Sequence, residues 1–229
     1  MINSEDFKKI LYDKGAILVG FANLVSIVDT DINYGISIAI NIPAQVIKSI
    51  CAGPSIGYYN QYFSLNNKLD EIANIGAEYL QIKGYKAFAQ TTDVIKQYDN
   101  YRTLLPHKTV ATKAGIGWIG KNALLTTEEF GSAIRLTSII TNAKLNYGIS
   151  VTESKCGHCL KCKDACPGEA ISGGLWHVGI DRDEFFNPIS CRNKALQIAN
   201  EKIHKEITLC GKCIEICPYT QRYIKQSHI

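Results

Sequence analysis

Nine cysteines and their spacing constrain this chain of 229 residues more than any other feature. The run from Cys156 to Pro167 has the spacing C-x2-C-x2-C-x3-C-P, and the run from Cys210 to Pro218 has the spacing C-x2-C-x3-C-P. The first spacing is typical of a segment that wraps a cubane iron–sulfur cluster with three thiolates and sends its fourth thiolate to a neighbouring cluster. One such run therefore predicts two clusters.

The second run is one thiolate short of a complete ligand set, and Cys191, which lies between the runs, is the candidate for the missing ligand. In the crossed arrangement, the cysteine before the proline of each run binds the cluster of the other run. The predicted ligands of one cluster are Cys156, Cys159, Cys162 and Cys217. The predicted ligands of the other are Cys166, Cys191, Cys210 and Cys213.

Zinc is the alternative metal, because C-x2-C pairs also bind zinc tetrahedrally. Three cysteines within seven residues, followed by C-P, favour two [4Fe–4S] clusters instead. Disulfides fit less well, because the N-terminal segment from Met1 to Asp6 lacks the charged and apolar regions of an export signal. We therefore expect a cytoplasmic protein whose cysteines bind metal rather than form disulfides.

Composition bounds the remaining possibilities. A hydrophobic content of 46% is enough to build a core, and the length suits one large domain or two small ones. The apolar stretches are too short to span a bilayer, so we expect no membrane partner. The formal net charge of +4 counts cysteines as neutral and comes without a run of five or six basic residues. Charge is therefore weak evidence for a nucleic-acid partner.

The N-terminal part reads as a mixture of helices and strands. Its pattern predicts, in order, a helix, two strands, a long helix and a third strand, over residues 4–15, 16–21, 35–41, 62–84 and 86–91. This order predicts an α/β (α+β) fold in which helices pack on a mixed sheet. We expect residues 1–150 to form a cofactor-binding α/β domain and residues 151–229 to form a ferredoxin-like domain with two clusters.

A glycine-rich loop follows a short predicted helix over residues 106–114. The loop, from Gly115 to Asn122, contains three glycines, which allow a backbone to approach another group closely. Without a strand before it and a helix after it, the loop is no nucleotide-binding fingerprint. Residues 123–126 and 132–141 predict an antiparallel hairpin.

The order of these segments resembles epoxyqueuosine reductase, the cobalamin-dependent enzyme that completes queuosine in tRNA. The resemblance extends from about His107 to Pro218 and is vague before it. It rests on the two cysteine runs and on the stretches Ala114-Gly115-Ile116-Gly117-Trp118-Ile119-Gly120-Lys121-Asn122, Gly131-Ser132-Ala133-Ile134-Arg135-Leu136 and Ile140-Thr141-Asn142. The Arg135-Leu136 and Ile140-Thr141 pattern is also similar to the corrinoid reductive dehalogenases.

The resemblance implies a nitroreductase-like α/β domain that binds a base-off corrinoid (cobalamin). It also implies a two-cluster ferredoxin module that delivers electrons to the cobalt one at a time. Flavin mononucleotide (FMN) is the alternative cofactor, because nitroreductase-like domains often bind a flavin. The residues implied to contact the corrin ring or its polar groups are Gly115, Gly117, Trp118, Ile119, Gly120, Lys121, Asn122 and Arg135.

The chain departs from the family pattern at three places. Gln90 stands where the family has an aspartate that is taken as the proton donor, and an amide cannot replace an acid in that role. The family's aspartate-tyrosine-histidine segment is Gln61-Tyr62-Phe63 here, which leaves Tyr62 as the expected catalytic residue. The helical-repeat domain that follows the clusters in the tRNA enzyme is missing. We therefore expect a small-molecule or corrinoid-linked substrate and not tRNA.

Three functions remain open at this point. The first is an oxidoreductase in which the two clusters reduce a corrinoid bound by the same chain, with a ferredoxin or flavodoxin as the electron donor. The second is a ferredoxin-like electron-transfer protein that reduces a partner's corrinoid or flavin. The third is an FMN-dependent reductase on the same fold.

Overall fold

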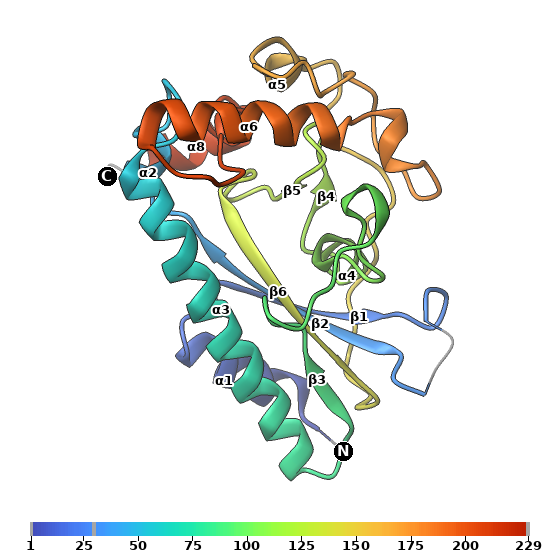
Figure 1. The fold of residues 1–229 in the computed structure, drawn as a ribbon. Helices are drawn as coiled ribbons and strands as arrows, with labels where there is room; N and C mark the ends of the chain where they lie inside the picture. Colours follow the sequence, from blue (N-terminus) through green and yellow to red (C-terminus); the bar gives the residue numbers. More distant parts are fainter. Residues whose placement is uncertain (1, 29–30, 228–229) are drawn as a thin grey trace. The chain divides into compact units, whose positions relative to one another are not determined.

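The computed structural model describes residues 2–28 and 31–227, and the chain divides into two compact units (Figure 1). Unit 1 comprises Met1–Asn41, Leu65–Gly117 and Arg135–Val151. Unit 2 comprises Ile42–Ser64, Trp118–Ile134 and Thr152–Ile229. The two units thus alternate along the chain. The predicted domains, 1–150 and 151–229, stay a prediction, and their residues 1, 29–30 and 228–229 lie outside the described residues.

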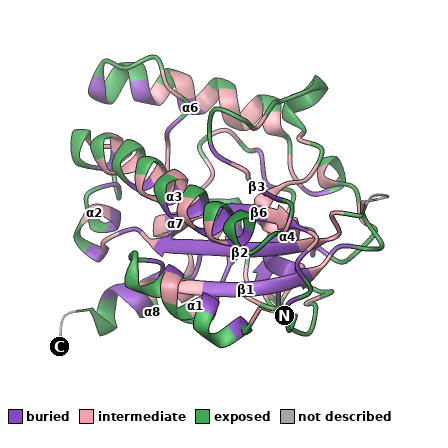
Figure 2. Cartoon of the chain, turned by 90° about the horizontal axis from the view of Figure 1, so that it is seen from below, coloured by how far each residue is buried: buried purple, intermediate pink, exposed green. Residues whose placement is uncertain are grey.

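Unit 1 is built on a four-stranded sheet with the strand order β1-β2-β6-β3. The strands are β1 (Leu18–Asn23), β2 (Tyr34–Asn41), β3 (Ala87–Ala89) and β6 (Ile134–Thr141). β1 pairs with β2 and β3 pairs with β6, both in the antiparallel sense. Figure 2 shows β1 and β2 buried along most of their length, since both faces of the sheet are covered. The predicted mixed α/β class is confirmed.

Helices cover both faces of this sheet. They are α1 (Ser4–Asp13), α3 (Ile56–Ile82) and α4 (His107–Lys113). α1 and α3 lie along one face and α4 on the other (Figure 1). Gly76 allows the close approach of α3, because a Cβ there would lie 2.7 Å from Ile139 of β6 and 3.0 Å from Leu11 of α1. On the opposite face, Val110 of α4 belongs to a buried cluster with Ala22 and Leu24.

Unit 2 contains short helices and one small hairpin. Its elements are α2 (Ala44–Lys48), β4 (Trp118–Ile119), β5 (Leu125–Thr126), α5 (Lys161–Asp164), a 3-10 turn (Arg182–Glu184), α6 (Pro188–Ile203), α7 (Lys212–Glu215) and α8 (Pro218–Gln226). The N-terminal part of α3, up to Ser64, also falls in this unit. A second 3-10 turn, Asp99–Tyr101, lies in unit 1. In the described part of the chain, no helix is long and apolar enough to cross a membrane.

The predicted hairpin between residues 123–126 and 132–141 is wrong. β5 pairs with β4 instead, so that Trp118 lies opposite Thr126. The chain leaves β5 through an isolated bridge between Thr127 and Gly131. The next backbone N–H, that of Ser132, donates to the Thr220 hydroxyl at 3.1 Å and not to a neighbouring strand.

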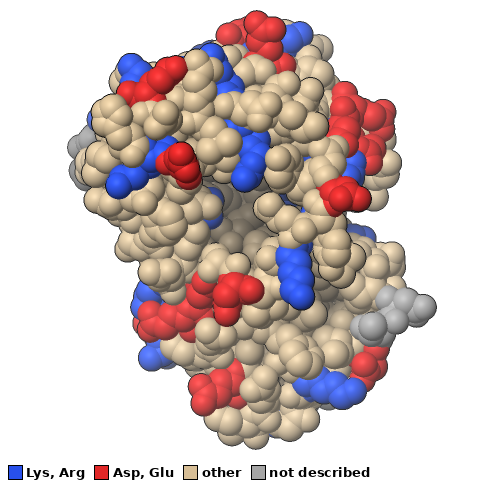
Figure 3. Space-filling view, viewed as in Figure 1, with Lys and Arg blue, Asp and Glu red and all other residues tan. Residues whose placement is uncertain are grey.

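Charged side chains are mixed on the face of the protein that Figure 3 shows, with Lys and Arg interspersed among Asp and Glu. This distribution agrees with the small formal net charge of +4. Surface charge on this face therefore points to no particular class of partner.

We predict that His107 makes unit 1 less stable in acid. Burial, reinforced by the nearby Arg135 charge and opposed by Asp70, lowers the pKa of His107 from 6.5 to about 4. The unfolded chain therefore binds more protons than the folded chain between these values, and the stabilisation present above pH 6.5 is lost as the pH falls towards 4. The loss should reach roughly 2–3 kcal/mol.

Denaturant unfolding at pH 7 and pH 4.5 measures this loss in the wild-type protein and in His107→Gln. The variant should show the smaller difference between the two pH values. His177→Gln is the control, because His177 is exposed. An equal acid sensitivity of the wild type and His107→Gln, or an NMR titration of His107 near pH 6.5, would contradict the prediction.

We predict that Gly131→Ala strongly destabilises unit 2. Gly131 has φ +58°, and an added Cβ would overlap the backbone nitrogen and hydroxyl of Thr220. The expected cost is roughly 2–3 kcal/mol. Gly157→Ala is the matched control, because Gly157 has φ +53° with open space around it and should cost only about 1 kcal/mol. Denaturant unfolding of both reconstituted variants measures the difference, and equal losses would contradict the proposed overlap.

Candidate metal centre

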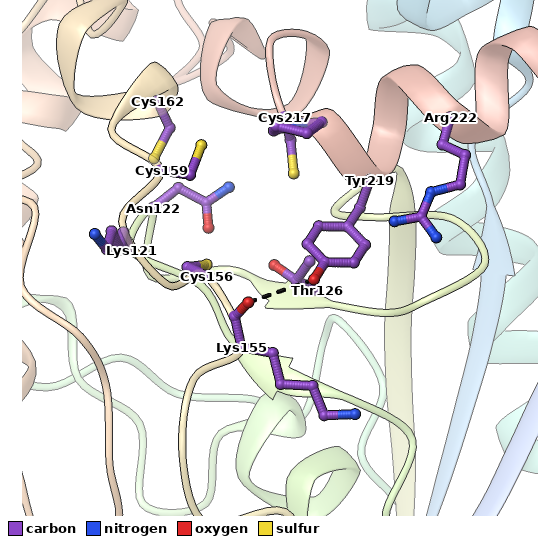
Figure 4. A pocket seen from close by; sticks show the side chains of 11 residues that line it. Lys121, Asn122, Thr126, Lys155, Cys156, Cys159, Cys162, Cys217, Tyr219 and Arg222 are labelled. Atoms are coloured by element: carbon purple, nitrogen blue, oxygen red, sulfur yellow. Dashed lines mark hydrogen bonds between the residues drawn. The ribbon is translucent and has the colours of Figure 1, made fainter.

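Four cysteine thiols of unit 2 line one cavity of about 300 Å³ (Figure 4). They come from both cysteine runs and are Cys156, Cys159, Cys162 and Cys217. These are the four residues that the spacing predicts for one cluster. The other residues that line the cavity are Lys121, Asn122, Thr126, Lys155, Pro218, Tyr219 and Arg222. The structure thus brings the first predicted ligand set together around one space.

The second predicted set is also brought together. Burial, together with the neighbouring Cys166 and Cys210 thiols, raises the pKa of the Cys191 thiol to about 11. Burial also raises the pKa of Cys213 far above its ordinary value, with Cys191 and Cys210 again acting in the same direction. Cys166, Cys191, Cys210 and Cys213 therefore lie close enough to repel one another's charge.

The two sets are neighbours. Cys162 of the first set is among the thiols that raise the pKa of Cys213 in the second. Within the first set, burial and then the thiols of Cys156, Cys217 and Cys159 raise the pKa of Cys162 to about 11. Without metal, such thiols are protonated at neutral pH, so metal binding must displace their protons.

The donor set fits a polynuclear cluster. The thiols border an open cavity, and among residues 2–28 and 31–227 no three His, Cys, Asp or Glu side chains are placed to hold one ion. A [4Fe–4S] cluster has several metal atoms held by thiolates, so its ligands surround a volume. Sulfur donors also suit iron–sulfur clusters better than the hard cations that prefer oxygen.

Local backbone features place these cysteines. Gly211 has φ +80° and precedes α7, whose first turn contains Cys213. Cys191 lies in the first turn of α6, where the Asn187 side chain accepts from the Ser190 N–H at 3.0 Å. Asn187 therefore caps α6 and fixes where this helix begins, which places Cys191 in its first turn. The sequence pattern did not predict α6.

Cys217 is anchored from its C-terminal side. Tyr219 packs edge-on against Trp118 with ring centroids 4.9 Å apart, and Thr220 accepts from the Ser132 N–H. Tyr223 donates its hydroxyl to the Ile42 carbonyl at 3.1 Å. The start of α8 is thus tied to segments from earlier in the chain.

The loop from Gly115 to Asn122, whose residues are implied to contact a corrinoid, has two different surroundings. Gly115 and Gly117 fall in unit 1, and a Cβ on Gly115 would lie 2.6 Å from the Ile149 carbonyl. Trp118 and Ile119 form β4 in unit 2, and both are buried. Glycine is required at position 115 because φ is +77° there.

Lys121 and Asn122 form the tip of the β4–β5 hairpin and line the cluster cavity, each only 4% exposed. Gly120 precedes them, and a Cβ there would lie 2.6 Å from the Thr126 hydroxyl. Asn122 donates to the Ser132 hydroxyl at 3.1 Å and to the Cys213 carbonyl at 3.4 Å. Its side chain therefore lies between the first cavity and a residue of the second set.

The remaining predicted site residues lie elsewhere. Arg135 of β6 donates to the Asn66 amide oxygen at 2.7 and 3.1 Å. Tyr62 is half-buried in the first turns of α3, with its ring 5.3 Å from that of Phe63. A corrinoid contact for Arg135 and a catalytic role for Tyr62 stay predictions.

A cavity of about 370 Å³ lies in unit 1, and Gln90 lines it. Most of its other lining residues are apolar, and Lys96, Tyr98 and Thr103 add polar groups. Sequence analysis missed this cavity, because its residues come from three separate segments. Its size is within the range of small-molecule sites.

Sequence analysis also missed an aromatic and cationic group beside the cluster cavity. The Lys155 ammonium lies 5.4 Å from the Trp118 ring centroid, and Arg222 lies 4.9 Å from that of Tyr219. The Tyr219 hydroxyl donates to the Lys155 carbonyl at 3.3 Å (Figure 4). The available signal was position, because Lys155 immediately precedes Cys156 and Tyr219 follows Cys217 by two residues.

Comparison with protein families finds a match over residues 155–220 to the model described as a 4Fe-4S double cluster binding domain. This match confirms the prediction of two [4Fe–4S] clusters. Among curated proteins, epoxyqueuosine reductase of Atelocyanobacterium thalassa (isolate ALOHA) is 32% identical over 126 residues. The alignment covers 55% of this chain and 41% of that protein, so the chain spans less than half of that relative's length.

Two solved structures share the fold. A reductive dehalogenase whose structure suggests a mechanism for B12-dependent dehalogenation matches with a TM-score of 0.73 and 17% identity, over 97% of this chain and 33% of that chain. An epoxyqueuosine reductase solved with an epoxyqueuosine-modified tRNA-Tyr stem loop matches with a TM-score of 0.63 and 18% identity, over 95% and 65%. At these identities the likeness concerns the fold.

The expectation that tRNA is not a partner is wrong. The curated relatives are epoxyqueuosine reductases, and one structural neighbour was solved with a tRNA stem loop. The expectation rested on where the sequence ends, which carries no evidence about the part of the fold that is shared with the tRNA-bound enzyme. Over about half of its length the chain is thus similar in sequence to epoxyqueuosine reductases, and it contains a 4Fe-4S double cluster binding segment.

Proposed function

We propose that this protein is an oxidoreductase that holds two [4Fe–4S] clusters and passes single electrons from them to a corrinoid. One observation carries the proposal: four thiols from two separate runs line one cavity, and the other four lie together beside them. A chain that only needed one structural metal would have no use for two adjacent all-thiol sets.

The residues of the chain hold and insulate the clusters. The thiols supply the ligands, the hairpin tip and Tyr219 line the first cavity, and Trp118 packs against Tyr219. When bound, the clusters supply one-electron redox chemistry at low potential. Asn122 lies between the two sets, so the sites are close neighbours, which suits transfer from one to the other.

Support for the corrinoid comes from the relatives and from the loop pattern. One structural neighbour is described as B12-dependent, and the proposed contacts are Gly115, Gly117, Trp118, Ile119, Gly120, Lys121, Asn122 and Arg135. When bound, the corrinoid supplies a cobalt that accepts the electrons. The unit 1 cavity that Gln90 lines is the proposed place for a small substrate group. We propose a ferredoxin or flavodoxin as the electron donor, and the cytoplasm as the compartment.

We predict that the crossed ligand sets determine how iron is lost. Cys162→Ser/Cys217→Ser removes two ligands of one proposed cluster and should lose about half of the iron and acid-labile sulfide. Cys162→Ser/Cys166→Ser removes one ligand from each cluster and should lose more than half. Iron and sulfide analysis after anaerobic reconstitution measures both losses.

The two double variants exchange their outcomes if each run binds its own cluster, so the experiment decides between the crossed and uncrossed sets. Cys51→Ser is the control, because Cys51 is exposed and belongs to neither set, and it should keep all of the iron. Full occupancy by zinc without sulfide would overturn the cluster assignment.

We predict that the reconstituted protein binds cobalamin at stoichiometric concentration. A corrinoid that binds base-off changes its visible absorption, because the lower axial nitrogen leaves the cobalt. Parallel titrations with cobalamin and with FMN measure binding, with the cluster-free protein as the control. A change for FMN alone would favour a flavin-dependent reductase. No change for either cofactor would favour an electron-transfer protein.

A further inference from the structure

Lys121 is a buried cation in the wall of the first cluster cavity. Its side chain is only 4% exposed and lines the cavity together with Cys156, Cys159, Cys162 and Cys217. Burying an ammonium group is costly unless an opposite charge or good hydrogen bonds compensate for it. The position of Lys121 therefore calls for a negative partner.

Among the described residues, the partner is not a carboxylate. The residues that line the cavity include no Asp or Glu, and no ion pair forms between Lys121 and a described acidic side chain. The groups that become negative in this cavity are the four cysteines, which bind a cluster as thiolates. The cluster with its thiolates is thus the negative charge available to Lys121 in this cavity.

The hairpin holds Lys121 in place. The Gly120 N–H donates to the Leu124 carbonyl at 2.9 Å, and the Ala123 N–H donates to the Gly120 carbonyl at 2.9 Å. Asn122 accepts from the Leu124 N–H at 3.2 Å. These bonds close a tight turn at the tip of β4–β5, so the backbone of Lys121 is fixed against the cavity.

Two other lysines near the cysteines have their charge paired with a carboxylate. Lys212, next to Cys213 of the second set, lies 2.8 Å from a carboxylate oxygen of Glu215. Lys155 lines the first cavity, but it is 56% exposed and pairs with Glu128 at 3.2 Å. Solvent and carboxylates screen both of these charges. Lys121 differs from these two lysines because it is buried and because no carboxylate lines its cavity.

We propose that Lys121 makes the cluster held by Cys156, Cys159, Cys162 and Cys217 the more easily reduced of the two. Reduction adds one electron from an external reductant, [4Fe–4S]²⁺ plus e⁻ giving [4Fe–4S]⁺, and a nearby buried cation stabilises the added negative charge. Electrons then move from the second cluster towards the first. The proposal rests on the two-cluster function proposed above.

The test is a redox titration with dithionite, followed by electron paramagnetic resonance. The wild-type protein should show two one-electron waves. In Lys121→Met and Lys121→Gln, the higher-potential wave should move to lower potential by at least a tenfold change in the reduction equilibrium, about 59 mV for one electron. The lower-potential wave should move much less. Lys155→Gln, which removes an exposed and paired charge from the same cavity, should leave both waves in place.

Each outcome is decisive. If iron and sulfide analysis finds fewer than two clusters in the wild type, the proposed function fails. If two clusters assemble but the Lys121 variants keep wild-type potentials, shift the lower wave, or shift no more than Lys155→Gln, the role of Lys121 is overturned. Two wild-type clusters that share a single potential would also overturn the proposal.

Discussion

The position of Cys217 beside the thiols of the first run is the constraint on which the rest of unit 2 depends. More than fifty residues separate Cys162 from Cys217 in the chain, so closing that distance costs conformational entropy. The structure offsets this cost with specific contacts after Cys217. Tyr219 packs on Trp118, and the Thr220 hydroxyl accepts a hydrogen bond from the Ser132 N–H. A cluster that takes ligands from both runs would add a covalent closure to these contacts.

The β4–β5 hairpin connects the cysteines to the rest of the fold. Its base carries Trp118, which packs against the residue after the Cys217-Pro218 pair, and its tip carries Lys121 and Asn122 into the cavity. One small element thus contributes an aromatic ring that packs against Tyr219, a buried lysine and an amide that bonds to Cys213 of the second set. The glycine-rich loop and the two cysteine runs therefore contribute residues to the same cavity.

The sequence predicted those features that depend on local spacing. Cysteine spacing pointed to two ligand sets, and apolar spacing located α1, β1, β2 and the long α3. It failed where partners are distant. The apolar pattern of residues 123–126 and 132–141 predicts two strands that pair with each other. Such a pattern does not determine which strand is the neighbour, and β5 in fact pairs with β4. The burial of Lys121 and the Gln90 cavity also depend on tertiary packing, which local patterns do not record.

The interleaving of the two units limits how the chain can be divided. The cysteine-rich segment that starts at Thr152 shares its unit with residues 42–64 and 118–134. Gly211 fits closely against Ile50 and Tyr58, and Tyr223 bonds to the Ile42 carbonyl. A cut near residue 150 would leave these surfaces without their partners. The two-cluster segment therefore cannot be moved alone into another protein. Its surroundings include residues 42–64 and 118–134, which interrupt unit 1 along the chain, so both parts of the chain would have to be exchanged together.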